Sequence, residues 1–272
     1  MNGKVYCITS MKGGVGKTEV SLNLAAAIKK KTGKSVVVVD FDIPYGGVSQ
    51  ALAVDKDVTL TDWIKTNRII TKELSRSLVI ETKWGFDIIP GVSSVYDISE
   101  ITSETIKRII GQLREFYDFV VIDSGVDFSE ITKTALLNAD KIIIVTTPSN
   151  VSVWNNHQYK EDLLTLGVDP VKVNLFLNQV PKKKQMDINI EKVIEIYEKS
   201  GVPIRTVGIA YYDDSIRKYR NKRQMIYIQK RKSDFAKAID EILEEFGVTI
   251  MYGQDHKEPL FGSLKRLFGV AR

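Results

Sequence analysis

The sequence contains few of the residue types that build metal clusters or disulfide frameworks. It has one cysteine, Cys7, and two histidines among 272 residues. A single thiol excludes an intrachain disulfide, and it is too few for an iron–sulfur cluster, which is held by several thiolates. Cys7 lies inside an apolar run, so we expect a small buried side chain in a reducing compartment.

Long apolar runs are also missing. No stretch approaches the roughly 18 apolar residues of a membrane-spanning helix, so the sequence predicts none. The first apolar run begins at residue 4, and we therefore expect no signal peptide and a cytoplasmic protein. The composition, 43% hydrophobic and 27% charged, is typical of a globular protein with a large core.

The positive charge of the chain is concentrated in its last quarter. Residues 201–272 hold 14 Lys or Arg and 9 Asp or Glu, and this difference of five equals the net charge of +5 of the whole chain. A local basic surface favours an anionic partner, either a membrane or a nucleic acid. The alternative is a charged face that is only solvated.

The most informative stretch is a glycine-rich loop, Lys12-Gly13-Gly14-Val15-Gly16-Lys17-Thr18. It follows an apolar run over residues 4–10 that reads as a buried strand, and it precedes residues 19–29, which have helical spacing. Strand, glycine-rich turn and helix form the setting that a phosphate-binding loop requires. The glycines let the backbone approach an anion, and the start of the helix adds its positive dipole. The alternative is a glycine-rich turn without a ligand.

This loop departs from the strict phosphate-loop pattern, because Met11 stands where the first glycine is expected and Lys12 adds a second lysine. It resembles the deviant Walker A loop of the MinD/ParA family of dimerising ATPases. The resemblance extends from Lys4 to about Phe246. It implies a single α/β domain with a doubly wound, mostly parallel sheet, which is the P-loop NTPase fold of the SIMIBI type. It also implies ATP and Mg²⁺ as cofactors and an ATP-dependent homodimer, in which Lys12 reaches the phosphates of the partner.

Two further stretches carry the carboxylates that such a site needs. The β-branched run over residues 35–40 ends at Asp40 and is followed by Asp42, and the apolar run over residues 119–122 ends at Asp123. Open α/β sheets bind ligands at the carboxyl ends of their strands. The resemblance implies that Asp42 orients the attacking water and that Asp40 and Asp123 lie near Mg²⁺. The alternative for both Asp40 and Asp42 is a strand-end residue that caps the next helix.

The resemblance assigns the remaining site residues as follows. Lys12, Lys17 and Asp42 are catalytic. Mg²⁺ is bound at Thr18, Asp40 and Asp123. ATP is bound by Gly13, Gly14, Val15, Gly16, Lys17, Thr18, Glu19 and Asn178. Asn178 ends an apolar run over residues 172–179 and matches the adenine reader of the family, although a strand-end turn is the alternative. Gly125 stands where the family usually has proline.

Hydrophobic patterns predict the other elements of the domain. We expect strands at residues 85–91, 141–147 and 202–209, and helices at 59–65, 103–117, 152–166 and 234–246. Residues 68–83 read either as a helix or as an irregular excursion, and we assign no chemistry to residues 48–85. The helix at 152–166 is expected at the dimer surface.

The end of the chain resembles the C-terminal membrane-targeting helix of MinD proteins. We expect an ATPase domain at residues 1–246, a linker at 247–258 and an amphipathic helix at 259–272. Its apolar face consists of Leu260, Phe261, Leu264, Leu267 and Phe268, with Lys265 and Arg266 on the other face. The expected partner is an anionic membrane surface, which makes the protein peripherally membrane-associated. The alternative is a helix that packs on the body of the protein or mediates oligomers.

Three functions remain open from the sequence. The first is a MinD-like ATPase that cycles on the membrane and positions a cellular assembly, with an unidentified activating protein. The second is a ParA-like ATPase that binds DNA non-specifically through a basic cluster over residues 217–232. The sequence around Asp42, Asp123 and Thr146 also resembles the ATPase domain of pilus-assembly proteins of the TadZ/CpaE type, so localisation of pilus assembly is an alternative within the same ATPase class. The third is a metabolic P-loop enzyme, for which no substrate pocket is evident.

Overall fold

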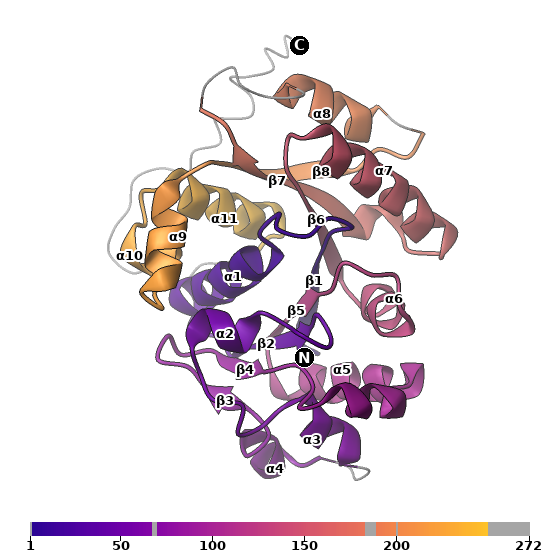
Figure 1. The fold of residues 1–272 in the computed structure, drawn as a ribbon, viewed down its shortest axis with the longest axis vertical. Coiled ribbons are helices and arrows are strands. Elements are labelled where there is room, and N and C mark those ends of the chain that lie inside the picture. The colour runs from indigo at the N-terminus through magenta and orange to yellow at the C-terminus, as the bar shows by residue number, and fades with distance from the viewer. Residues whose placement is uncertain (1, 67–69, 183–188, 200, 250–272) are drawn as a thin grey trace.

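An eight-stranded sheet forms the centre of the structure, a computed structural model that describes residues 2–66, 70–182, 189–199 and 201–249 (Figure 1). The strand order is β3-β4-β2-β5-β1-β6-β7-β8. All neighbouring strands run parallel except β3, which pairs antiparallel with β4. The strands are β1 (Lys4–Thr9), β2 (Val36–Phe41), β3 (Ile80–Glu81), β4 (Asp87–Ile89), β5 (Phe119–Ser124), β6 (Lys141–Thr146), β7 (Val173–Val180) and β8 (Arg205–Tyr211).

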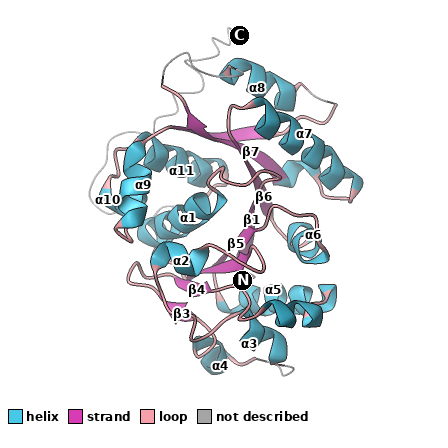
Figure 2. Cartoon of the chain, viewed as in Figure 1, coloured by secondary structure: helices cyan, strands magenta, loops and turns pink. Residues whose placement is uncertain are grey.

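Helices cover both faces of this sheet, as Figure 2 shows. One face packs against α1 (Lys17–Thr32), α2 (Val48–Leu52), α10 (Ile226–Gln229) and α11 (Asp234–Glu245). The other packs against α3 (Leu60–Lys65), α5 (Ser103–Phe116), α6 (Glu130–Leu137), α7 (Asn150–Thr165) and α8 (Ile190–Glu198). The short α4 (Lys72–Arg76), α9 (Asp214–Asn221) and two 3₁₀ helices, η1 (Val95–Glu100) and η2 (Pro170–Lys172), complete the described elements.

The central strands are buried on both faces, which explains their composition. Every residue of β2 is buried, and its sequence begins with four consecutive valines. A parallel strand covered by helices on both sides selects such continuous β-branched runs. Cys7, in the middle of β1, is a free thiol with no exposed surface, as expected.

Helix α1 leaves the glycine-rich loop directly and is anchored at its other end by Gly33. Gly33 adopts a left-handed φ of 67°, and its N–H donates to the Lys29 carbonyl oxygen at 3.0 Å. This is the usual way in which glycine ends a helix. The helix begins at Lys17, two residues before the start that the sequence predicted.

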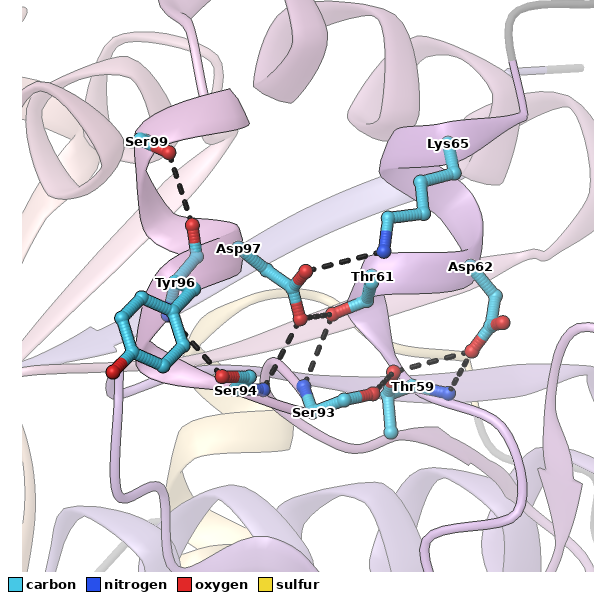
Figure 3. A network of polar contacts seen from close by, with 9 residues as sticks. All are labelled: Thr59, Thr61, Asp62, Lys65, Ser93, Ser94, Tyr96, Asp97 and Ser99. Carbon is cyan, nitrogen blue, oxygen red and sulfur yellow. Dashed lines mark hydrogen bonds and ion pairs between the residues drawn. The ribbon is translucent and has the colours of Figure 1, made fainter.

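A polar network fixes the chain that follows β4 (Figure 3). The Thr61 hydroxyl donates to Asp97 at 3.0 Å, Lys65 pairs with the same carboxylate at 3.2 Å, and the Ser93 N–H donates to the Thr61 hydroxyl at 3.0 Å. Because Thr61 and Lys65 lie on α3 and Asp97 on η1, these bonds hold η1 beside α3 at the carboxyl edge of β4.

The region between residues 48 and 85 shows where the sequence was least informative. It contains two helices of five residues, α2 and α4, and the antiparallel strand β3. The sequence predicted neither α2 nor β3, and it left residues 68–83 as a helix or an excursion.

No described helix is long and apolar enough to cross a bilayer.

Candidate functional site

A cavity of about 390 Å³ lies at the carboxyl edge of the sheet, beside the glycine-rich loop. Its lining includes Gly14 from the loop after β1, Lys17 from the first turn of α1, Asp42 from the loop after β2, Asn178 from β7, and Arg217 from α9. This volume falls in the range of small-molecule sites, and the edge is where parallel sheets bind ligands. The sequence-predicted loop, carboxylate and asparagine therefore meet in one pocket.

The glycine-rich loop adopts a backbone that requires glycine. Gly14 and Gly16 have φ of 76° and 96°, in the left-handed region that glycine enters without steric cost. Gly16 is the N-cap of α1, and no side chain of the described residues caps that helix. The first N–H groups of α1 and the positive end of its dipole are therefore available to an anion.

Thr18, at the start of α1, is tied to Asp123 at the end of β5. Its hydroxyl donates to Asp123 at 2.6 Å, and the hydroxyl of Ser21, one turn further, donates to the other carboxylate oxygen at 2.9 Å. Burial raises the pKa of Asp123, and these hydrogen bonds only partly oppose that effect. Because the Thr18 hydroxyl uses its proton on Asp123, its lone pairs remain free to bind a cation.

Asp40 lies beside Asp123 in the neighbouring strand. The two residues are register partners between β2 and β5, and both are fully buried. Asp40 accepts from the N–H of Asp42 at 3.1 Å and from that of Val48 at 3.0 Å. Burial and the Asp123 carboxylate raise the pKa of Asp40. Two buried carboxylates side by side resist ionising together, and a divalent cation would stabilise the ionised pair, so the pair fits a site for Mg²⁺.

Asp42 follows β2 and is more exposed than Asp40, which lies within that strand. Burial raises the pKa of Asp42, the positive charge of Lys17 lowers it, and the Asp127 carboxylate raises it again. Gly125 makes this arrangement possible, because a Cβ at that position would lie 2.5 Å from Asp127 Oδ2 and 3.2 Å from Asp42 Oδ1. Gly125 thus leaves room for a second carboxylate near Asp42.

Asn178 and Gln179, at the end of β7, both contact the glycine-rich loop. Asn178 Nδ2 donates to the carbonyl oxygen of Val15 at 2.7 Å, and Gln179 Nε2 donates to that of Gly14 at 3.0 Å. Asn178 Oδ1 is the one buried side-chain oxygen or nitrogen of the described residues without a hydrogen-bond partner. A buried acceptor without a partner costs free energy, and a ligand N–H in the cavity would satisfy it.

The buried amide of Asn156, on α7, supports the other end of the loop. Its Oδ1 accepts from the N–H of Met11 at 2.8 Å, and its Nδ2 donates to the hydroxyls of Ser10 and Thr146 at 3.1 and 2.8 Å. Helix α7 therefore holds the backbone that precedes Lys12. Sequence reasoning missed Asn156, Ser21 and Gln179. Only Ser21 had a signal, because it follows Lys17 by four residues on the same helix face.

Lys12 and Glu19 differ from the other predicted site residues. Lys12 is half-buried, and its ammonium forms no ion pair within the described part of the chain. Glu19 lines the cavity, but its carboxylate accepts from Asn23 Nδ2 at 2.8 Å. The side chain of Val15 is buried in the core, so only its backbone can contact a ligand. The predicted membrane residues Leu260 to Phe268 lie outside the described residues.

The described residues contain no group of three or more His, Cys, Asp and Glu side chains that could hold a metal by itself. A Mg²⁺ ion here would therefore use the Thr18 hydroxyl and reach Asp40 and Asp123 together with waters and phosphate oxygens. Mg²⁺ binds nucleotides in this way, keeping several waters. The described donors thus fit a magnesium–nucleotide complex better than a free metal ion.

The fold and the site together define a P-loop nucleotide-binding protein. A family model described as an AAA domain matches residues 3–162, which is more than half of the chain. The chain belongs to this family, in its MinD/ParA-like branch.

Curated relatives match over almost the whole length. The septum site-determining protein MinD of Escherichia coli is 26% identical over 283 residues, covering 98% of this chain and 99% of the relative. The MinD protein of Bacillus subtilis is 26% identical over 277 residues, with the same coverage of 98% and 99%.

Solved structures confirm the fold. A ParA family ATPase from Chlorobium tepidum has a TM-score of 0.76 and 23% identity, covering 89% of this chain and 98% of its own. MinD from Pyrococcus horikoshii, complexed with Mg-ADP, has a TM-score of 0.73 and 23% identity, covering 90% and 96%. The predicted doubly wound, mostly parallel α/β domain is confirmed. At the level of the family, these likenesses support a positioning ATPase.

Proposed function

We propose that this chain is an ATP-dependent switch that dimerises on ATP, hydrolyses it to ADP, and cycles on and off an anionic membrane to position a cellular assembly. The observation that carries the proposal is the pocket in which the glycine-rich loop meets Asp42 and Asn178, whose Oδ1 is unpaired, while Asp123 lies behind its lining and is hydrogen-bonded to Thr18. A solved MinD relative is complexed with Mg-ADP, which supports nucleotide and Mg²⁺ at this site.

Each side chain has a role that its position supports. Lys17 lies next to the free N–H groups of α1 and neutralises charge on the β- and γ-phosphates, and Asp42 orients the attacking water. Asn178 Oδ1 accepts from the exocyclic amine of adenine. Mg²⁺, when bound at Thr18, supplies electrostatic stabilisation of the transferred phosphoryl group. Lys12 from the partner completes the site, so hydrolysis depends on pairing.

The exposed apolar side chains support pairing through the nucleotide edge. Ten large apolar or aromatic side chains are exposed among the described residues, and seven lie in loops that follow strand carboxyl ends or in the first two turns of the helices after them. The seven are Tyr45, Val95, Tyr96, Val126, Val151, Trp154 and Tyr212. Where side chains of this kind form one continuous patch, they mark a protein contact. A second copy placed face to face would cover it and bring its own Lys12 to the phosphates.

The membrane part of the proposal depends on the amphipathic pattern at residues 259–272. One such segment gives weak binding, because burying five apolar side chains is nearly offset by the entropy of ordering the helix. Two tails on one dimer make the second contact intramolecular, which raises avidity by roughly 10²- to 10⁴-fold. Membrane binding would then follow the nucleotide state.

Sedimentation with anionic liposomes tests this proposal. We expect ATP with Mg²⁺ to raise the bound fraction of the full chain, and ADP to leave it low. A chain that ends at residue 258 should hydrolyse ATP but remain in the supernatant. Equal sedimentation of the full and the shortened chain would contradict membrane targeting, while leaving the ATPase activity intact.

A second candidate, DNA binding, is favoured by the charges on and after α9. Arg217, Lys218, Arg220, Lys222 and Arg223 are exposed, and none of them forms an ion pair with another described residue. Free cations on one surface bind phosphates without sequence preference. This candidate predicts ATP-dependent, salt-sensitive binding to arbitrary duplex DNA, lost when Arg217, Arg220 and Arg223 are changed to Glu. Binding without such loss would contradict it.

A further inference from the structure

Two consecutive side-chain amides at the end of β7 hold two consecutive carbonyl groups of the glycine-rich loop. Asn178 donates to Val15 and Gln179 donates to Gly14, across more than 160 residues of sequence. The position of Asn178 is explained by its proposed contact with the adenine base. The contact of Gln179 has no such explanation, although its side chain also lines the cavity.

The backbone at Gln179 is distorted in a way that allows this contact. Successive side chains of a regular strand point to opposite faces, so residues 178 and 179 would not both reach one loop. Gln179 has φ of 57°, in the left-handed region that non-glycine residues rarely enter, and the pairing of β7 with β8 shifts register between Leu177 and Val180. Distortions of this kind persist where the surrounding structure enforces them, often at ligand sites.

The held carbonyls set the direction of the N–H groups that face a phosphate. In a trans peptide, the C=O of one residue and the N–H of the next lie in one plane and point in opposite directions. A bond to the Gly14 carbonyl therefore fixes the Val15 N–H, and a bond to the Val15 carbonyl fixes the Gly16 N–H. Gly14 and Gly16 rotate easily, so without these bonds the loop would populate other orientations.

We propose that Gln179 is a positioning residue of the phosphate loop, which holds the Gly14–Val15 peptide so that its N–H points toward bound phosphates. This inference rests on the proposed binding of ATP in the cavity. It assigns to Gln179 an effect on affinity that acts through the loop and not through contact with the nucleotide. The loss of one neutral hydrogen bond predicts a rise of about two- to twelvefold in the Kd for ATP.

Three variants of the full chain separate positioning from simple stabilisation. Gln179→Met keeps the length of the side chain but removes the donor. Gln179→Gly removes the donor and also relieves the left-handed backbone. Gln179→Lys restores a donor, and comparing its Kd at low and high salt shows how much of its effect comes from the added charge. Gln158→Met is the matched control, because Gln158 is exposed on α7 and bonds only to Asp162 among the described residues.

The experiment measures the Kd for ATP with Mg²⁺ by calorimetry and the melting temperature without nucleotide. We expect Gln179→Gly to melt at or above the temperature of the wild type and yet to bind ATP more weakly. Gln179→Met should bind equally weakly, Gln179→Lys more tightly than Gln179→Met, and Gln158→Met like the wild type.

Wild-type ATP affinity in Gln179→Gly would overturn this inference, and so would a Gln179→Lys chain as weak as Gln179→Met. Both results would leave the proposed function standing, since the wild type would still bind. A wild-type chain that does not bind ATP would overturn the proposed function, and this inference with it.

Discussion

Thr18 and Asp123 are 105 residues apart in the sequence, and their side chains share a hydrogen bond of 2.6 Å. The bond joins the first turn of α1, the helix that follows β1, to the end of β5, the strand that pairs with β1. It puts a neutral hydroxyl and a buried carboxylate at the place where a Mg²⁺ ion would meet the phosphates.

Replacing Asp123 with Asn should separate stability from function. The fully buried carboxylate has a raised pKa, so its neutral amide isostere should leave the melting temperature without nucleotide unchanged or higher. The tightening of ATP binding by Mg²⁺ should disappear, and turnover should fall roughly 10²- to 10³-fold. Calorimetry with and without Mg²⁺ measures the first effect and phosphate release the second. Unchanged Mg²⁺ dependence would show that Asp123 takes no part in the metal site.

Replacing Lys12 with Ala should affect pairing more than binding. Lys12 forms no ion pair with any described residue, so its loss should cost the monomer little stability. We expect ATP binding within about threefold of the wild type, but no ATP-dependent dimer in light scattering and little turnover. Lys218→Ala, a change to an exposed lysine on α9, is the control. A dilute, monomeric Lys12→Ala chain with full turnover would refute the role in the partner's site.

Replacing Gly125 with Ala tests the space beside Asp42. The added Cβ would lie 2.5 Å from Asp127 Oδ2, and Asp127 is held through its other oxygen by Ser129 and Thr132. Displacing these carboxylates should lower turnover by about tenfold while ATP affinity changes little.

Gly111→Ala provides the matched control for that variant. Gly111 lies within α5, and a Cβ there meets nothing within 4 Å. This change should raise stability by about 0.5–1 kcal/mol, the usual preference for Ala over Gly in a helix, and leave turnover unchanged. Equal turnover in the two variants would show that the space at Gly125 has no effect on hydrolysis.

The pair of Asp213 and Lys230 predicts a dependence of stability on pH. Asp213 caps α9, and its carboxylate lies 2.9 Å from Lys230 Nζ. Burial raises the pKa of Asp213, but hydrogen bonds from Ser215 and Lys230 outweigh it and lower the pKa to about 2. The folded pKa lies below the unfolded value of about 4, so the pair stabilises the fold above about pH 4 and loses this effect as the pH falls toward 2.

Lys230→Met should therefore melt below the wild type at about pH 6, and the difference should shrink as the pH falls below about 4. Lys232→Met serves as the control, because exposed Lys232 forms no ion pair with a described residue. A difference that stays constant across this range would contradict the assigned partner. Thermal melts at several pH values measure it.

The sequence predicted the central part of the molecule because strong local signals coincide there. Four consecutive valines in β2 and the glycine-rich loop before α1 have few other interpretations. The sequence also placed Asp40 and Asp123 at the carboxyl ends of strands, but only the structure shows that these two strands are neighbours. Short elements such as β3 and α2 were missed, because two to five residues carry too little periodicity to be recognised.

The contacts that Asn156 and Gln179 make with the glycine-rich loop could not be predicted from the sequence, for a different reason. Asn156 is buried by tertiary packing. The sequence of α7 is polar around it and does not indicate that Asn156 is buried while the adjacent Asn155 is exposed. The positive φ of Gln179 is unexpected for its residue type, so only the structure reveals that it faces the same loop as Asn178.

The place of β1 inside the sheet affects how the domain opens. β1 has β5 on one side and β6 on the other, whereas the outermost β3 pairs only with β4 among the described strands. Amide hydrogens of Lys4–Thr9 should exchange with deuterium only when the whole domain unfolds, and those near Ile80 much sooner. The nucleotide loop is thus attached to the slowest-exchanging segment of the chain, and partial fraying at the edge can occur without releasing its anchor.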